Sequence, residues 1–419
     1  MLIHWIWLAT RPGMNDRQRK AALETFGDAE DVYFADRQDY AGIEGLTSEV
    51  ADALADKKLT ASEEILEQCR QKKIRICTFQ DAAYPTRLKN IADPPMVLYY
   101  RGQLPDLGRS PVIAVVGTRQ ASAYGMTVAK RMGYQIARCG GIVVSGLASG
   151  IDGMAMRGAL TAGNFVVGVL GCGADVVYPH SNRSLYADTE KCGCLLTEFP
   201  PGTQPLKWNF PKRNRIISGL SNGVLVVEAP EKSGALITAR QAADQGRDVF
   251  VVPGNIDVDT CVGSNALLRE GAISAMSGWD VVSEYAHLYP EKIRKDTTPA
   301  RQTAGAEETE TAWNVREKAG LRVAQMPRQG DRSRPADRKK EKKPIDNGEN
   351  QGYSDQRKPL PPLSEEEQRI MELLKSEMLV DDLVAQLRLP TGKVLSALTM
   401  LQIKGVIRQL PGKRVTRSE

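Results

Sequence analysis

Short, wholly apolar runs alternate with helical segments between residues 111 and 285, and this alternation constrains the fold more than any other feature. Apolar runs without regular polar positions are typical of strands buried on both faces. Helices between such strands provide the crossovers that a parallel sheet requires. The sequence therefore predicts an α/β fold with a Rossmann-like, doubly wound, mostly parallel sheet. The predicted strands are 112–117, 141–146, 165–171, 194–199, 223–229 and 248–254, with 272–276 as a shorter seventh.

Three further regions flank the sheet domain, which we place at residues 79–288 and which opens with a proline-punctuated crossing segment. Residues 1–78 are predicted to be helical, either a unit similar to a sterile-alpha-motif or helix-hairpin-helix domain or a plain helical packing domain. Residues 289–361 are rich in charged and poor in apolar residues, which predicts a flexible linker. Residues 362–419 combine three helices with a hairpin, typical of a winged-helix domain that either binds DNA or docks a protein.

The net charge and the cysteine content exclude few classes of function. The net charge is +5 over 419 residues, so a nucleic-acid partner requires a local cluster of cations. Seven scattered cysteines and three histidines supply no set of four metal ligands, so we expect free thiols, no metal and no cofactor. No apolar stretch is long enough to cross a membrane, and the sequence predicts a cytoplasmic protein.

Small, polar, glycine-rich loops follow the predicted strands, and the clearest are residues 117–119, 145–152 and 171–175. Ligands of a doubly wound sheet bind beyond the carboxyl ends of its strands, so these loops are expected to share one rim. Glycine amides and helix N-termini can bind an anion there, and Arg119 can donate two parallel hydrogen bonds to a phosphate. None of the loops matches the dinucleotide or P-loop fingerprint.

Few residues suggest catalysis. The three histidines lie in separate regions, and no Ser-His-Asp or Cys-His set can be assembled. Asp152 and Asp175 in the rim loops either accept a hydrogen bond from a ribose or cap their own turns. Glu198 and Glu228, near strand ends, are the other carboxylates of interest. We therefore predict that the protein is not an enzyme.

Cations crowd into the stretch before the strand 223–229. Lys212, Arg213 and Arg215 surround Asn214 in "FPKRNR", which we interpret as a basic turn leading into the core. Such a turn either faces a negatively charged ligand or lies solvated on the surface.

Six ordered motifs extend from the first predicted strand to the last. They are "VVGTR" (115–119), "SGLASGIDGMAMRGAL" (145–160), "VLGCGADVVYP" (169–179), "FPKRNRIISGLSNGVLVVEA" (210–229), "SGALITARQAADQGRDVFVVPG" (233–254) and "GSNALLREGA" (263–272). Together they resemble the DprA/Smf family, the bacterial DNA-processing protein A. The helical front and winged-helix tail are also similar to the layout of that family. One departure is Met156, where the family often has histidine.

The resemblance implies a dimeric, single-stranded DNA-binding recombination mediator that protects incoming strands and helps to load the RecA recombinase in natural transformation. It implies DNA-binding roles for Arg119, Ser145, Gly146, His180, Lys207, Lys212, Arg213, Asn214 and Arg215. The basic turn would then face Arg119 across the strand ends, with Trp208, Phe210 and Tyr178 as candidates for base stacking. The segment 262–275 is either an apolar contact patch or part of the core.

Two other functions remain open from the sequence. One is a nucleotide-binding enzyme of the phosphoribohydrolase-like Rossmann group, although "VPGNIDVDT" (252–260) does not match the P-G-G-x-G-T-x-x-E motif of those enzymes. The other is a nucleotide sensor whose winged helix reports on a small ligand at the rim. Tight binding of a mononucleotide without DNA would favour the sensor.

Overall fold

The structure is a computed structural model that describes residues 1–43, 45–295, 364–374, 378–387, 389, 391–404, 406–410 and 414–417. Residues 296–361 of the predicted linker lie outside the described residues. The chain divides into two compact units, residues 1–326 and 327–419, and each is described by itself. The four domain ranges given above stay a prediction.

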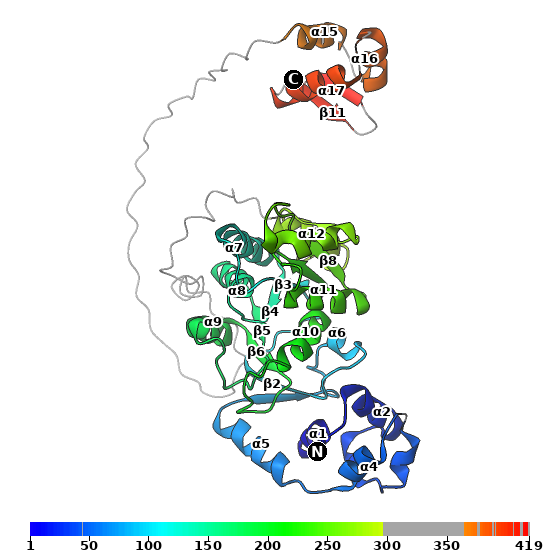
Figure 1. The fold of residues 1–419 in the computed structure, drawn as a ribbon, viewed down its shortest axis with the longest axis vertical. Coiled ribbons are helices and arrows are strands. Elements are labelled where there is room, and N and C mark those ends of the chain that lie inside the picture. Colours follow the sequence, from blue (N-terminus) through cyan, green and yellow to red (C-terminus); the bar gives the residue numbers. More distant parts are fainter. Residues whose placement is uncertain are drawn as a thin grey trace, which may run out of the picture. The chain divides into compact units, whose positions relative to one another are not determined.

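One sheet organises the first unit (Figure 1). Among the described residues, nine strands pair in the order β1-β2-β6-β5-β4-β3-β7-β8-β9. The strands from β6 to β9 in that order run parallel, and β2 and β1 add an antiparallel edge. The predicted doubly wound, mostly parallel sheet is therefore confirmed. The strands are β1 (Arg75–Thr78), β2 (Val97–Gly102), β3 (Val112–Val116), β4 (Ile142–Ser145), β5 (Val166–Val169), β6 (Cys194–Thr197), β7 (Gly223–Val226), β8 (Asp248–Val251) and β9 (Ile273–Ser274).

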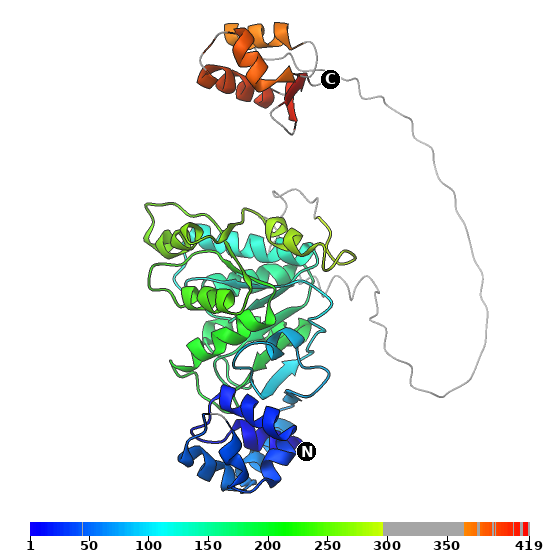
Figure 2. The same ribbon diagram turned by 90° about the vertical axis from the view of Figure 1, so that its right-hand side faces the viewer.

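Helices cover both faces of this sheet (Figure 1 and Figure 2). Along β3, Ile113 and Val115 contact one layer, whereas Val112, Ala114 and Val116 contact the other. Successive side chains of a strand point to opposite faces, and both faces are covered here, so the strand is apolar along its whole length. The first layer holds α7 (Ala123–Arg138), α8 (Ile151–Thr161), α9 (Arg183–Cys192) and α13 (Gly278–Val282). The second holds α6 (Thr86–Lys89), α10 (Asn209–Leu220), α11 (Gly234–Asp244) and α12 (Val262–Arg269).

The segment 79–102 differs from its prediction, because it is not only a crossing segment. It contains α6 and ends in β2, which pairs with β6 and β1. Pro94 and Pro95 lie just before β2, where no ladder hydrogen bond is lost. In the part of the chain that the structure describes, no helix has the length and hydrophobicity needed to span a bilayer.

The N-terminal helices form a core of their own against β2, the second strand from the edge of the sheet. Trp7 and Tyr40 are fully buried in this core, together with Tyr99 of β2. The side chain of Asn15 caps the second helix in a capping box with Gln18. The helical prediction for residues 1–78 holds as far as Gln71, but its last residues, Arg75–Thr78, form β1 and pair with β2. The helices are α1 (Leu2–Ala9), α2 (Asp16–Phe26), α3 (Ala29–Phe34), α4 (Ser48–Ala55) and α5 (Thr60–Gln71).

The second unit has the predicted winged-helix elements. Ser364 and Glu367 form a capping box at the start of its first helix. Its strands pair antiparallel in the order β10-β12-β11. The elements are α15 (Glu365–Leu373), β10 (Met378–Leu379), α16 (Val380–Leu387), α17 (Thr391–Ile403), β11 (Ile407–Leu410) and β12 (Arg414–Arg417).

Candidate nucleic-acid interface

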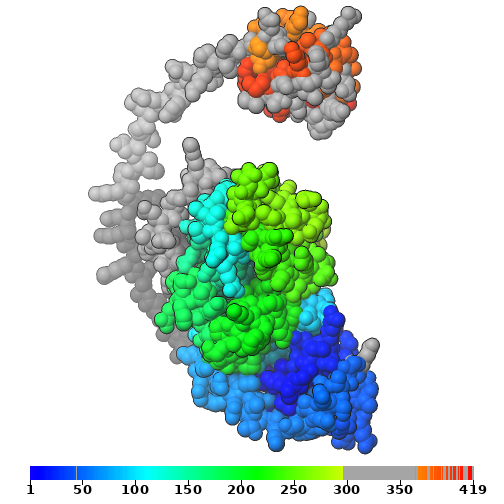
Figure 3. Space-filling model, viewed as in Figure 1, coloured from blue at the N-terminus to red at the C-terminus, as the bar shows by residue number. Residues whose placement is uncertain are grey.

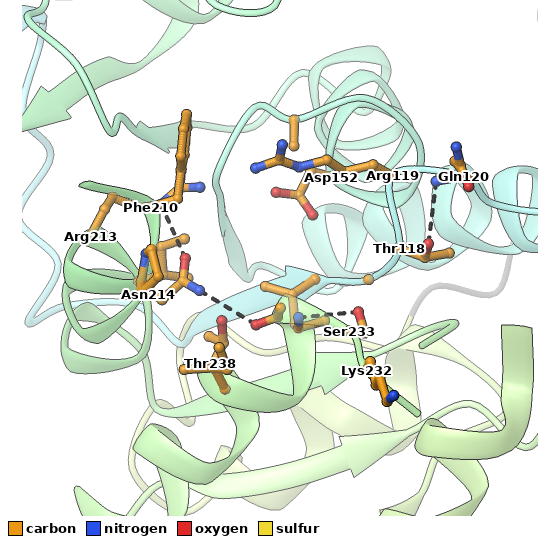
Figure 4. A pocket seen from close by; sticks show the side chains of 18 of the residues that line it. Thr118, Arg119, Gln120, Asp152, Phe210, Arg213, Asn214, Lys232, Ser233 and Thr238 are labelled. Atoms are coloured by element: carbon orange, nitrogen blue, oxygen red, sulfur yellow. Dashed lines mark hydrogen bonds between the residues drawn. The ribbon is translucent and has the colours of Figure 1, made fainter. Parts of the chain in front are cut away.

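A cleft of about 620 Å³ opens at the carboxyl ends of β3 and β7. β3 leads to α7 on one face of the sheet and β7 leads to α11 on the other, so their connecting loops diverge at this point. Crevices for ligands form where the strand order reverses in this way. Loops that follow β3, β4, β5, β6 and β7 line the cleft, together with α10 (Figure 4). The expectation that these loops share one rim is met.

Phe210 lies at the centre of the charged side of this cleft. The guanidinium of Arg119 lies 5.0 Å from its ring centroid and that of Arg213 lies 5.9 Å away, both within cation–π range. The ring of Tyr178 is 5.5 Å away, tilted by 40°. Gly171 makes room for this arrangement, because a Cβ there would lie 2.9 Å from the Phe210 ring. The cleft therefore offers aromatic surfaces beside two arginines.

Arg213 is buried but still lines the cleft. Its Nη1 donates to the carbonyls of Val169 and Gly146, the latter over 2.9 Å, and its Nε donates to Asn214 over 3.2 Å. These bonds use three of the five guanidinium N–H groups and leave those of Nη2 for a ligand. Burial lowers the pKa of Arg213, and Asp152 opposes that shift. Gly146 permits this contact, since a Cβ there would lie 2.4 Å from Nη1.

Asp152 supports the loop that Arg213 rests on. Its Oδ2 accepts from the amide of Gly146 over 3.1 Å, and its side chain is buried. Burial raises the pKa of Asp152, and the neighbouring Arg213 opposes the rise. Asp175 similarly accepts from the amide of Gly202 at 2.9 Å. Asp152 therefore caps an amide of its own loop, whereas Asp175 binds an amide of the loop after β6 and pairs with Lys72.

A substitution at Gly150 tests how tightly the loop after β4 is fixed. Gly150 has a φ of +77°, and an added Cβ would lie 2.4 Å from the carbonyl oxygen of Thr118. We expect Gly150→Ala to lower the free energy of unfolding by roughly 1–3 kcal/mol in a urea titration. Gly246→Ala is the matched control, because Gly246 has a φ of +67° with no atom near an added Cβ. Equal losses in both variants would mean that the contact with Thr118 does not matter.

Further cations and polar groups lie along the cleft. Lys207 and Lys232 are exposed and line it, on the loop after β6 and the loop after β7. Ser233 caps α11, and the buried Thr238 lies one turn further along that helix. The sequence did not assign Lys232, Ser233 or Thr238 to the site, because they line the same cleft as Arg119 only through the order of the strands.

Four of the predicted binding residues do not line the cleft, namely Ser145, His180, Lys212 and Arg215. Ser145 is fully buried, and its hydroxyl donates to the carbonyl of Val115 over 2.6 Å. His180 is exposed in a short 3₁₀ helix (His180–Asn182). Arg119, Lys207, Arg213 and Asn214 line the main cleft, and Gly146 lines a smaller pocket that shares Arg119, Phe210 and Arg213 with it. A DNA-binding role for each of them stays a prediction.

The basic segment is a helix rather than the predicted turn. Residues 209–220 form α10, with Pro211 in its first turn, where no helical hydrogen bond is lost. Lys212 and Arg215, one turn apart on this helix, do not line the cleft. Arg215 is 3% exposed and forms ion pairs with Asp16, Glu198 and Asp93.

Comparison with known proteins identifies relatives of both units. The family model of DNA recombination-mediator protein A matches residues 75–286, and that of the DprA winged helix domain matches residues 354–413. DNA processing protein DprA of Bacillus subtilis is 43% identical over 235 residues, which cover 56% of this chain and 78% of that protein. Protein Smf of Synechocystis is 42% identical over 212 residues, covering 50% of this chain and 53% of that protein. The crystal structure of DprA from Streptococcus pneumoniae superposes with a TM-score of 0.61 at 35% identity, covering 68% of this chain and 98% of that one.

Proposed function

This chain belongs to the family of DNA recombination-mediator protein A, and we propose that it binds single-stranded DNA in the cleft between β3 and β7. The observation that carries this proposal is the arrangement around Phe210, whose ring lies beside Arg119, Arg213 and Tyr178. Aromatic rings stack on unpaired bases, and arginines bind the phosphates between them.

Single strands fit this arrangement better than duplex does. In a duplex the bases are paired and stacked on one another, so their faces cannot reach Phe210 or Tyr178. The cations of the cleft contact phosphates whatever the base sequence, so we expect little sequence preference. Among the described residues that line the cleft, Asp152 is the only carboxylate, and it is engaged with a backbone amide. A cleft with this lining supports binding rather than acid–base catalysis.

A titration of fluorescently labelled oligo-dT, beside a duplex of the same length, tests the proposal. We expect tight binding of the single strand, weak binding of the duplex and an affinity that falls with salt. For single strands the logarithm of the binding constant falls by about 0.7 per phosphate contact for each tenfold rise in salt. Equal affinity for duplex and single strand would contradict the proposal.

The contribution of base stacking on Phe210 to DNA binding can be measured separately from that of the charged side chains. Phe210→Leu keeps an apolar side chain and removes the ring, so we expect oligo-dT binding to weaken by about fivefold with an unchanged salt slope. Phe165→Leu is the matched control, because Phe165 is a half-exposed aromatic at the opposite, amino end of β5. The measurement is fluorescence anisotropy over several salt concentrations, and an unaltered affinity in Phe210→Leu would exclude stacking there.

We further propose the finer role that the resemblance implies. The bound strand is handed to the RecA recombinase, the protein acts as a homodimer in the cytoplasm, and the pathway served is natural transformation. Leu267 and Leu268 of the suggested contact segment pack against the core, whereas Ile273 is 41% exposed and is the better candidate for an intermolecular contact. A strand-exchange assay with purified RecA is expected to start faster when the protein is added, and sedimentation is expected to give the mass of two chains.

A further inference from the structure

A buried cluster of charges joins α10 to the N-terminal helices. One guanidinium nitrogen of Arg215 lies 2.9 Å from Asp16 and 2.5 Å from Glu198. Lys212, one turn earlier, lies 3.4 Å from the same Asp16. Asp16 is the first residue of α2 and is separated from Arg215 by 199 positions in the sequence. Figure 3 shows the N-terminal helices, in blue, packed directly against the green sheet domain.

Asp16 is itself held firmly. Arg19 Nη1 donates to its carboxylate over 2.7 Å. The other donors of Arg19 bind the backbone carbonyls of Leu8 and Arg11, over 3.1 and 3.2 Å. Asp16 is thereby tied both to its own helix and to the end of α1. Buried hydrogen bonds of this kind hold the groups that they join in place.

Another side of α10 carries the side chains of the cleft. Arg213 and Phe210 line the cleft, whereas Lys212 and Arg215 bind the charge cluster. Successive residues of a helix are rotated by about 100°, so one rigid helix presents both sets at once. Any movement of α10 that loosens the charge cluster also moves Arg213 relative to the carbonyl of Gly146, to which it donates.

We propose that Asp16 is a positioning residue for DNA binding, through which the N-terminal helical domain fixes α10 and thus the arginine and phenylalanine in the cleft. This inference rests on the proposed function, because it names a residue outside the cleft that sets the affinity of the cleft. It assigns Arg215 to the link between the domains and not to a phosphate.

Whether Asp16→Asn weakens or strengthens DNA binding distinguishes a positioning role of Asp16 from a purely electrostatic one. Removing a negative charge near a site that binds an anion strengthens binding if only the charge matters. Loss of positioning weakens binding instead. We therefore expect Asp16→Asn to weaken oligo-dT binding by about fivefold, within the range found for residues that act through their neighbours. Asp16→Glu retains the charge and is expected to restore most of the affinity.

The experiment uses the full chain, with circular dichroism to confirm folding of each variant. Glu49→Gln is the matched control, since Glu49 is an exposed acid on α4 of the same domain. In an Arg213→Ala background, Asp16→Asn is expected to add a smaller loss than in the native chain, because part of its effect passes through Arg213. Independent losses in the double variant, or binding by Asp16→Asn as tight as that of Glu49→Gln, would overturn the proposal. If Asp16→Asn does not fold, Asp93→Asn replaces it, because this variant removes a half-exposed ion-pair partner of Arg215. Asp93→Asn is expected to weaken oligo-dT binding by about twofold. Unchanged or tighter binding of oligo-dT overturns the proposal.

Hydrogen exchange without DNA gives a second, independent readout. Peptides that cover residues 209–220 are expected to exchange faster in Asp16→Asn than in the native chain, and unchanged exchange would overturn the proposal. If the native chain does not bind oligo-dT, the proposed function fails while this measurement still reports the link between the domains. The two failures are thus distinguishable.

Discussion

Replacing Arg119 with alanine is expected to weaken the binding of oligo-dT by about tenfold to a hundredfold. Arg119 is exposed at the carboxyl end of β3 and lies over the ring of Phe210. A hydrogen bond to a charged group contributes about 1.5–3 kcal/mol, which corresponds to that range. One phosphate contact fewer also lowers the salt slope by about 0.7. Fluorescence anisotropy at several salt concentrations measures both quantities.

Arg17→Ala is the matched control for this prediction. Arg17 is an exposed arginine on α2, so its loss changes the net charge equally without touching the cleft. We expect its affinity to stay within about twofold of that of the native chain, because exposed charges beyond a Debye length of about 8–10 Å are screened. If the two variants bind equally well, Arg119 contributes only general charge and the cleft is not the binding site.

The second large effect is on stability. Arg215→Ala is expected to lower the free energy of unfolding by about 3 kcal/mol, because the buried Glu198 loses its nearest cation and keeps only the half-exposed Lys212, whereas Asp16 keeps Arg19. This is a large fraction of the stability of an ordinary domain. Urea denaturation followed by circular dichroism measures the change in the midpoint.

Arg70→Ala is the comparison for Arg215→Ala. Arg70 also forms an ion pair, with Glu67, but its side chain is 81% exposed. Exposed pairs contribute about 0–1 kcal/mol, so this variant is expected to denature nearly like the native chain. A loss of less than 1 kcal/mol in Arg215→Ala would mean that its carboxylate partners find water or other cations.

The sheet was predictable because its signal is local. Strands such as Val112–Val116 are buried on both faces, and a continuous apolar run identifies them without knowledge of their neighbours. The rim position of Arg119 follows in the same way, since it comes directly after a strand whose carboxyl end lies at the ligand-binding edge. The prediction that the ligand is a nucleic acid came from the family resemblance.

The partners of the basic segment were not predictable from the sequence pattern. The sequence does not distinguish the roles of Lys212, Arg213 and Arg215, because all three are cations in one short stretch. They differ because α10 places their side chains on different sides of a helix. The carboxylate that holds Arg215 lies 199 positions away, in a domain whose packing the sequence pattern does not reveal. Pro211 does not prevent the helix, because the first helical turn tolerates proline.

Photo-cross-linking tests the central claim most directly, because it reports where the DNA lies. An oligo-dT that carries 4-thiothymidine is bound to the full chain and irradiated, and the linked peptides are identified by mass spectrometry. We predict cross-links at Tyr178 and in the segment Lys207–Phe210, at the wall of the cleft. Cross-links confined to residues 364–417 would contradict the account and assign the DNA to the winged helix.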